Sequence, residues 1–215
     1  HPFLYEVSHG HIKSSYFNEK KVIVLGGGNV AFDVARTARR LAGDTAIVCL
    51  ECEDRTSRDG IPADPEEIRG AWEEGIRIVY SRGVRKIYGE SERVRRIECP
   101  RCISVFDETG FNPQFDTSDA IFLEGDIVIV TVGQGPEKSS LQEENLLNER
   151  GQLALDPITL QSLNKEWVFV GGDLRKIGFM VDAMRDGLVA AESIERYLRE
   201  IDLKKGRKKL YEAED

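Results

Sequence analysis

The chain has 215 residues, of which 40% are hydrophobic and 32% are charged, a composition typical of a globular protein with enough apolar material for a buried core. Its formal net charge of −8 argues against a general binder of nucleic-acid backbones, which needs a basic face. No apolar stretch approaches the roughly 20 residues that cross a bilayer, and no signal-peptide pattern opens the chain. We therefore expect neither a nucleic-acid nor a membrane partner, and we expect a cytoplasmic location. Because residue 1 is His and not Met, we expect a fragment of a longer protein.

The first part of the chain predicts a strand, a helix and a second strand. Residues 1–19 show no clean hydrophobic period and are expected to be a leader or linker. Residues 20–28 are a short, nearly continuous apolar run that ends in glycines, and residues 29–42 have apolar side chains at helical spacing. Residues 45–51 are the next apolar run. This order predicts a right-handed parallel crossover.

A strong helix start follows. Asp64 is suited to the N-cap, Pro65 to the first helical position, and Glu67 to a capping box. Gly75 is expected to end this helix, and residues 76–81 are expected to form a third strand.

The pattern then changes to strands without helices between them. The strand-like runs 83–89, 92–106 and 118–125 predict a three-stranded antiparallel meander. Residues 126–136 predict a return to a buried strand that ends in glycines.

The last part of the chain predicts a loop, a strand and a long helix. Residues 138–163 are polar, with a possible helical turn at 139–147, and residues 167–173 (WVFVGGD) resemble another buried strand. Residues 179–200 predict an amphipathic helix that contains small residues for close packing: Ala183, Gly187, Ala190 and Ala191. The tail, 201–215, is expected to be charged, solvated and frayed.

The four cysteines form two CxxC pairs, Cys49 with Cys52 and Cys99 with Cys102. A zinc site or a redox dithiol would use such spacing, and both remain alternatives. In a strand, however, positions i and i+3 point to opposite faces, so we favour structural, reduced thiols and expect no metal. Reduced thiols fit a cytoplasmic protein.

The first glycine-rich turn matches a dinucleotide-binding fingerprint. Gly26 permits the tight turn, Gly28 lets the backbone approach a pyrophosphate, and Ala31 allows close packing of helix on strand. Asn29 and Val30 begin the helix, whose N-terminal N–H groups would face the phosphates.

Glu51, at the end of the next strand, is placed to accept the ribose hydroxyls of an adenosine. A carboxylate there repels a 2′-phosphate, so we expect NAD(H) to be favoured over NADP(H). Arg55 and Arg58 follow in the next loop, and either side chain could bind a 2′-phosphate instead. The other interpretation is that both arginines are solvated beside Glu53 and Asp54.

The order of these segments resembles the FAD-dependent pyridine nucleotide–disulfide oxidoreductase superfamily, and within it the branch of the glutamate synthase small subunit. The likeness rests on four segments, GGGNVAFDVARTARRL, PADPEEIRGAWEEGI, DIVIVTVGQGP and VFVGGD with its long helix. It implies an α/β fold, with a Rossmann-like βαβ NAD(P)-binding domain and meander at 20–136. Residues 137–200 would then be the C-terminal strand-helix portion of a split FAD domain. The N-terminal FAD half, with its own glycine fingerprint, is not found in this sequence.

The resemblance also implies roles for several residues. Gly172 and Asp173 would contact FAD, and Met180 and Val181 would begin a helix aimed at the flavin. The alternative for Gly172 and Asp173 is a tight strand-to-helix turn in which Asp173 is a cap. Nearer the nicotinamide would lie Asp33, Gly133 and Gln134, although Asp33 could instead pair with a nearby arginine of its helix.

The function implied is that of the NAD(P)H-binding portion of a larger oxidoreductase. That enzyme would pass hydride from NAD(P)H to FAD and then electrons to a partner acceptor such as an iron–sulfur protein. The chain alone is expected to be inactive and to have no catalytic acid or base of its own. The alternative from another class is a non-enzymatic NAD(H)-binding sensor or interaction module.

Overall fold

The computed structural model describes residues 2–41, 43–91, 93–135, 139–148 and 151–208. The chain divides into two compact units, 1–134 and 135–215.

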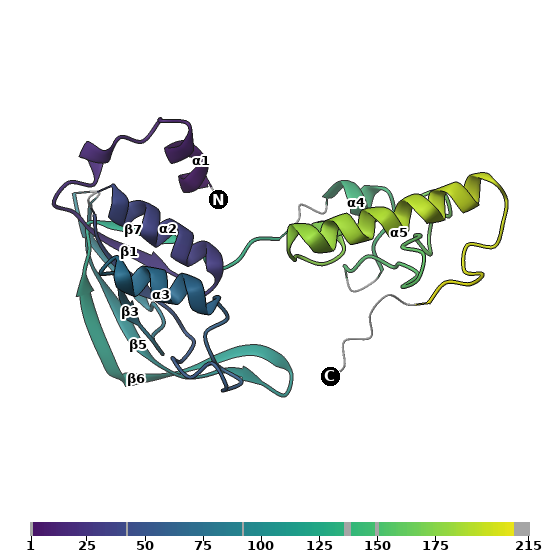
Figure 1. Ribbon diagram of the computed structural model, residues 1–215. Coiled ribbons are helices and arrows are strands. Elements are labelled where there is room, and N and C mark those ends of the chain that lie inside the picture. Colours follow the sequence, from purple (N-terminus) through teal and green to yellow (C-terminus); the bar gives the residue numbers. More distant parts are fainter. Residues whose placement is uncertain (1, 42, 92, 136–138, 149–150, 209–215) are drawn as a thin grey trace. The chain divides into compact units, whose positions relative to one another are not determined.

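The first unit is built on a four-stranded parallel sheet of β1 (Lys21–Leu25), β2 (Asp44–Val48), β3 (Arg77–Val79) and β7 (Ile127–Val130). Their order across the sheet is β3-β2-β1-β7. The helices α2 (Asn29–Arg40) and α3 (Pro65–Glu73) connect β1 to β2 and β2 to β3 and lie in front of the sheet in Figure 1. The predicted βαβ unit is therefore confirmed.

The apolar faces predicted from residue spacing form two cores, one on each side of the parallel sheet. On the helix side, Phe32 and Val34 of α2 and Ile68 of α3 pack with Val24 and Ile47 of the strands. Fully buried side chains on both faces explain why these strands have continuous apolar runs and no alternation.

A second sheet covers the other face. It contains β4 (Lys86–Glu90), β5 (Arg93–Asp107) and β6 (Gly110–Glu124), which are antiparallel in the order β4-β5-β6, as the meander predicted. Ile97 and Leu123 of this sheet pack against Ile23, Leu25 and Val48.

The third meander strand begins at Gly110, well before the predicted start at residue 118. The first half of this strand was not predicted because its sequence lacks the hydrophobic alternation of a half-buried strand. In the structure, Phe111 and Phe115 in this half are 66% and 39% exposed. The strand pairing continues there through a tight turn at Gly110, whose φ is +120°.

Residues 1–19 are more than the expected leader or linker. They contain α1 (Pro2–Ser8) and the short 3₁₀ helix η1 (Ser14–Tyr16). Phe17 is only 1% exposed and belongs to the helix-side core, with Phe3 and Leu4 packed against that core. The buried ring of Phe17 anchors residues 1–19 to the first unit. The spacing of hydrophobic residues in this segment does not predict such a contact.

Two local predictions were wrong. Asp64 lies at the N-cap of α3, but its side chain makes no capping bond, and Glu67 pairs with Arg36 of α2 in place of completing a capping box. The strand β7 is only partly covered, and Val130 is 52% exposed, because β7 is the edge of the sheet and not a central strand.

The second unit contains α4 (Ser139–Glu143), η2 (Gly172–Leu174) and the long helix α5 (Met180–Leu198). The helical turn predicted near 139–147 and the long C-terminal helix are both present. The expected buried strand at 167–173 is not: Phe169 makes a single bridge to Gln161, Trp167 is 62% exposed, and Gly172 begins η2. A strand requires a continuous ladder, and the described part of this unit supplies only isolated bridges.

The expected frayed tail is partly anchored as well. Arg207 donates to Ser193 Oγ at 2.7 Å and to the Val189 carbonyl at 3.0 Å, both on α5. Lys204 forms an ion pair with Asp156 at 2.5 Å. These contacts hold the described residues 201–208 on the unit, whereas 209–215 lie outside the described residues.

Candidate functional site

The first candidate site lies where three neighbouring strands end. Leu25 at the end of β1 is paired with Val48 of β2 and with Val130 of β7. The glycine turn follows β1, Glu51 follows β2, and Gly133 follows β7, so these segments share the carboxyl edge of one parallel sheet. Open α/β sheets bind ligands at this edge.

Gly26 and Gly28 differ in what surrounds them. Gly26 has a φ of +137°, and a Cβ there would lie 2.6 Å from the carbonyl oxygen of Thr131, so the close approach of the turn to β7 requires glycine. A Cβ on Gly28 would meet nothing within 4 Å. The backbone at Gly28 therefore borders open space, as a cradle for a diphosphate needs.

Gly28 is also the N-cap of α2, and its position supplies no side-chain cap. The first N–H groups of the helix are thus not satisfied by a capping side chain, and the positive end of the helix dipole faces the same space. An anionic group is the favoured occupant there.

Glu51 closes the turn from the side of β2. A Cβ on Gly27 would lie 2.4 Å from Glu51 Oε2, so the middle glycine makes room for this carboxylate. Burial raises the pKa of Glu51, with backbone N–H groups opposing that shift. The structure thus brings Glu51 to the glycine turn, as the ribose role requires.

Asn29 has a structural task. Its Nδ2 donates to Asp64 Oδ2 at 2.8 Å, and its Oδ1 accepts the Asp64 backbone N–H at 2.8 Å. This reciprocal pair joins the start of α2 to the start of α3. Asn29 can therefore offer a ligand its backbone and not its amide, whereas the neighbouring Val30 is 39% exposed.

Asp33 lies one turn further along α2 and is exposed. The arginines of its own helix have other partners: Arg36 binds Glu67 and Glu74, and Arg39 binds the Glu74 carbonyl. Burial and the charge of Glu67 raise the pKa of Asp33, and Arg36 lowers it.

The loop after β7 is open. Gly133 has a φ of +112°, which favours glycine, and a Cβ there would meet nothing within 4 Å. Gln134 is exposed, and Pro136 of the predicted turn lies outside the described residues.

The two arginines after Glu51 differ in their contacts. Arg58 donates to the Asp107 carbonyl at the end of β5. Arg55 is exposed, and its guanidinium makes no ion pair within the described ranges of the chain. Of these two arginines, Arg55 is the one whose guanidinium makes no bond to another described residue.

The second candidate region lies in the second unit, where the GGD turn meets the start of α5. Gly171 is required there, because a Cβ would lie 2.8 Å from the Cβ of Asp186. Gly172 has a φ of +63° and donates its N–H to Asp186 Oδ2 at 3.0 Å. Asp173 is exposed and accepts a long bond of 3.4 Å from the Gly178 N–H.

Met180 and Val181 begin α5 and are 80% and 68% exposed. Asp182 accepts the N–H of the N-cap residue Phe179 at 3.1 Å. The structure thus brings Gly172, Asp173, Met180 and Val181 into one exposed region.

Asp186 organises this region and carried no sequence signal. Its carboxylate, 4% exposed, accepts bonds from Arg175 Nε at 2.7 Å and Nη2 at 2.9 Å. Burial alone would raise the pKa of Asp186, but Arg175 and the Gly172 N–H together hold it below its usual value.

The cysteines are free thiols. Burial raises the pKa of Cys99 to about 11 and raises the pKa of Cys49, so both favour the unreactive thiol form. Across the described residues, no three His, Cys, Asp or Glu side chains gather in a way that could hold a metal ion. Within the same ranges, no helix has the length and apolarity needed to span a bilayer.

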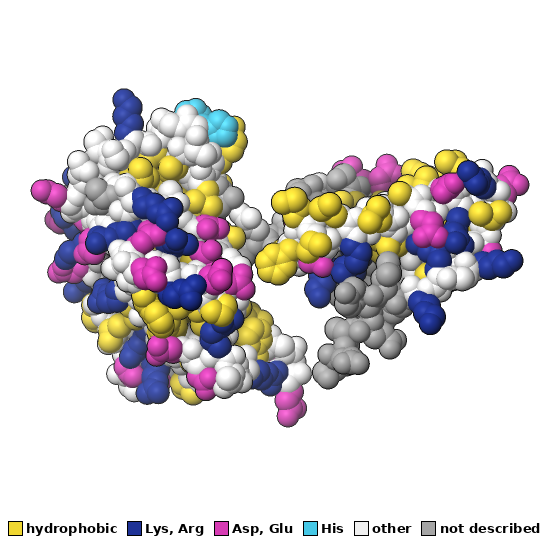
Figure 2. Space-filling model, in the orientation of Figure 1, with side chains coloured by type: hydrophobic (Ala, Val, Ile, Leu, Met, Phe, Trp, Pro, Cys, Tyr) yellow, Lys and Arg dark blue, Asp and Glu magenta, His cyan; other side chains and the backbone are white. Residues whose placement is uncertain are grey.

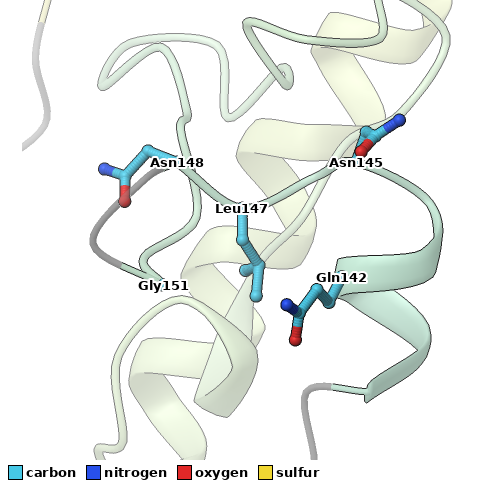
Figure 3. A pocket seen from close by; sticks show the side chains of 5 residues that line it. All are labelled: Gln142, Asn145, Leu147, Asn148 and Gly151. Carbon is cyan, nitrogen blue, oxygen red and sulfur yellow. The ribbon is translucent and has the colours of Figure 1, made fainter.

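Figure 3 shows a hollow in the second unit beside α4. Gln142 and Leu147 project into the same space, and Asn145 and Asn148 point to opposite sides of it. Gly151 completes the lining. None of these residues was predicted to bind a cofactor, and the lining has no charged side chain among the described residues.

In sequence, the chain is similar to subunits of known oxidoreductases. The chain is 34% identical to the beta subunit of the NADP(+)-dependent formate dehydrogenase of Moorella thermoacetica, over 84% of this chain and 25% of the relative. It is also 34% identical to the small chain of the NADPH glutamate synthase of Azospirillum brasilense, over 84% of this chain and 37% of the relative. The chain therefore spans well under half the length of these two relatives. Both are named for NADP(H), which contradicts the preference for NAD expected from Glu51.

The fold has solved counterparts. Thioredoxin reductase of Lactococcus lactis matches with a TM-score of 0.67 and 18% identity, over 87% of this chain and 56% of that structure, which supports the predicted α/β fold. The model of the pyridine nucleotide-disulphide oxidoreductase family matches residues 6–187. The likeness to this family predicted from four sequence segments is confirmed, and the chain belongs to the pyridine nucleotide-disulphide oxidoreductase family.

Proposed function

We propose that this chain is the NADPH-binding portion of a flavin-dependent oxidoreductase that works in the cytoplasm. When bound, NADPH would supply a hydride, FAD would accept its two electrons, and a partner such as an iron–sulfur protein would receive them. The chain's own residues would bind and orient the dinucleotide. The main support is the open space at Gly28, which adjoins uncapped helix N–H groups and Glu51 on one sheet edge.

Each residue of this edge would have one task. The N–H groups at Gly28, Asn29 and Val30 would hold the diphosphate, and Glu51 would accept the ribose hydroxyls. Asp33, Gly133 and Gln134 would lie toward the nicotinamide.

For the adenosine 2′-phosphate we propose Arg55. Its side chain is exposed and makes no bond to the part of the chain that the structure describes, whereas Arg58 donates to the Asp107 carbonyl. This assignment replaces the preference for NAD, and it agrees with the NADP(H) named for both relatives.

Calorimetric titration with NADPH and with NADH tests the assignment. Arg55→Gln should weaken NADPH binding by about tenfold, or roughly 1.4 kcal/mol, and leave NADH binding unchanged. Arg69→Gln is the matched control, because Arg69 is an exposed arginine on α3. Equal losses for both nucleotides would contradict a 2′-phosphate contact.

In the same proposal, residues 137–200 are part of an FAD domain. Gly172 and Asp173 would face the ribityl or phosphate region, and Met180 and Val181 would lie at the flavin. The exposed apolar face of α5 supports this assignment to an FAD domain, because a helix face that remains in solvent is normally polar. Figure 2 shows hydrophobic side chains along α5. Five hydrophobic residues at the N-cap and in the first half of this helix are each at least 64% exposed: Phe179, Met180, Val181, Met184 and Leu188.

We propose that the remainder of the flavin domain covers this face, in the part of the relatives that the chain does not span. The chain alone should therefore bind NADPH without retaining flavin. An absorption spectrum after incubation with FAD and gel filtration checks this. A stoichiometric yellow complex would show that the chain holds a complete flavin site.

A sensor without flavin chemistry remains the second hypothesis from the sequence. No contact in the described residues favours it, and membership of an oxidoreductase family weighs against it. Nucleotide-dependent association with a partner, without a need for flavin in the full-length protein, would revive it.

A further inference from the structure

The outer face of the antiparallel sheet carries two exposed cations, Lys86 and Arg96, beside aromatic rings, although the chain as a whole has a net charge of −8. Glu98 and Glu124 lie on the same face, opposite Lys86 and Arg96 in the strand register. The opposite face of this sheet, with Ile97 and Leu123, is buried against the parallel sheet. Side chains alternate along a strand, so Lys86, Tyr88, Arg96 and Phe122 point outward.

These outward side chains form one stacked cluster. The guanidinium carbon of Arg96 lies 5.0 Å from the centroid of the Tyr88 ring and 4.7 Å from that of Phe122. Lys86 Nζ lies 4.8 Å from the Tyr88 ring. Packing against two rings restrains the guanidinium of Arg96 by cation–π contact.

The carboxylates near this cluster are already engaged. Glu98 is 3% exposed and binds the Tyr88 hydroxyl at 2.8 Å and the Arg85 guanidinium. Glu124, opposite Arg96 in the register, binds Lys21 of β1. Within the described part of the chain, Lys86 and Arg96 form no ion pair of their own. With both glutamates bound to other cations, Lys86 and Arg96 are the two charges of the cluster that the described ion pairs do not use.

We propose that the cluster of Lys86, Tyr88, Arg96 and Phe122 is a docking surface for an acidic segment of a partner protein. Tyr, Phe and Arg are the residue types enriched where protein interfaces carry most of their binding energy. Phe122 is 51% exposed and supplies apolar area beside the cations, and the N–H edges of Arg96 match carboxylate geometry. A nucleic acid is disfavoured, because two unpaired cations are too few to follow a phosphate backbone against an overall charge of −8.

This surface is separate from the proposed dinucleotide site. It lies on strands β4–β6, whereas that site lies at the carboxyl edge of the parallel sheet. Binding to it should therefore not require NADPH, and a failure here would leave the proposed function untouched.

The test is a binding titration of the full chain with a fluorescein-labelled deca-glutamate peptide, followed by fluorescence anisotropy. We expect binding that weakens as salt rises, and a loss of about tenfold or more in the Lys86→Glu/Arg96→Glu variant. The matched control is Lys13→Glu/Arg69→Glu, which makes the same charge change at two exposed positions of the same unit. This control should stay within about twofold of the unaltered chain, since remote exposed charges are screened.

A second measurement covers the case in which the charge reversal disturbs the sheet. In the unaltered chain, amide chemical-shift changes on adding the peptide should cluster on β4–β6. Equal weakening in both double variants, shift changes confined to other elements, or no binding at low salt would each overturn the proposal. Tighter binding of a ten-nucleotide oligo-dT would assign the face to nucleic acid instead.

Discussion

At the scale of single residues, adjacent glycines of the first turn have different physical tasks. Gly26 is required by the fold, because its φ is positive and Thr131 lies against it. Gly27 is required because the Glu51 carboxylate lies against it. Neither a positive φ nor a close contact requires glycine at position 28. A Cβ on Gly28 would meet nothing within 4 Å, so packing does not explain this glycine, and we propose that a bound ligand does.

This contrast predicts different stabilities for two alanine variants. Gly26→Ala should lower the free energy of unfolding by about 2–4 kcal/mol, through left-handed strain and overlap with the Thr131 carbonyl. Gly28→Ala should change it by less than about 1 kcal/mol, since its φ of −88° suits any residue and its Cβ enters open space. Urea unfolding followed by circular dichroism checks both. Similar losses in the two variants would show that both glycines serve the fold.

The sequence predicted the glycine turn and Glu51 because a fixed spacing after an apolar run encodes them. It did not predict that Asn29 would bind Asp64, 35 residues away, or that Asp186 would hold Gly172. Both contacts join side chains that only the folded chain brings together, and Asp and Asn have many uses on a helix. The roles of the site residues toward ligands stay predictions.

At the scale of elements, Asp186 on α5 holds the η2 turn through Gly172 and Arg175. Asp186→Asn should lower the stability of this region by about 2 kcal/mol, because the partly buried Arg175 would lose its counter-charge. The exposed pair of Arg199 and Glu195 supplies the control, and Glu195→Gln should cost less than about 0.5 kcal/mol.

The same carboxylate predicts a pH dependence. The folded-state pKa of Asp186 is lowered, so its contribution to stability is complete above its unfolded pKa of about 3.9 and is lost as pH falls through the folded value. Urea unfolding of the unaltered chain and of Asp186→Asn between pH 7 and pH 2 should give curves that converge below about pH 4. A constant difference down to pH 2 would mean that this carboxylate does not titrate with folding.

Elements were predicted well where local pattern and burial agree. Continuous apolar runs predicted β1 and β2, and hydrophobic residues at helical spacing predicted α2 and α5. The run at 167–173 failed because its apolar side chains meet no continuous strand ladder in the described residues. The helix α1 was missed because its burial depends on Phe3 and Phe17 reaching a core formed by later residues.

At the scale of the whole molecule, the exposed face of α5 is the feature least suited to a free chain. Met184 and Leu188 are 64% and 75% exposed and lie one turn apart. We expect Leu188→Lys to reduce self-association of the chain without lowering its unfolding midpoint, since the side chain is exposed. Sedimentation velocity over a range of concentrations checks this.

The opposite effect is expected in a longer protein in which a flavin domain covers α5. There the same lysine would be buried, so FAD retention should fall. Unchanged flavin content in that Leu188→Lys protein would contradict a covered face.

The central claim is that the carboxyl edge of the parallel sheet binds NADPH at Gly28. Calorimetric titration of NADPH into the unaltered chain and into Gly28→Val tests it most directly. We predict one site with a dissociation constant of about 1–100 µM, roughly −8 to −5.5 kcal/mol, and a loss of at least about tenfold in the folded valine variant. The same affinity in both proteins, or no binding to the unaltered chain, would contradict the account.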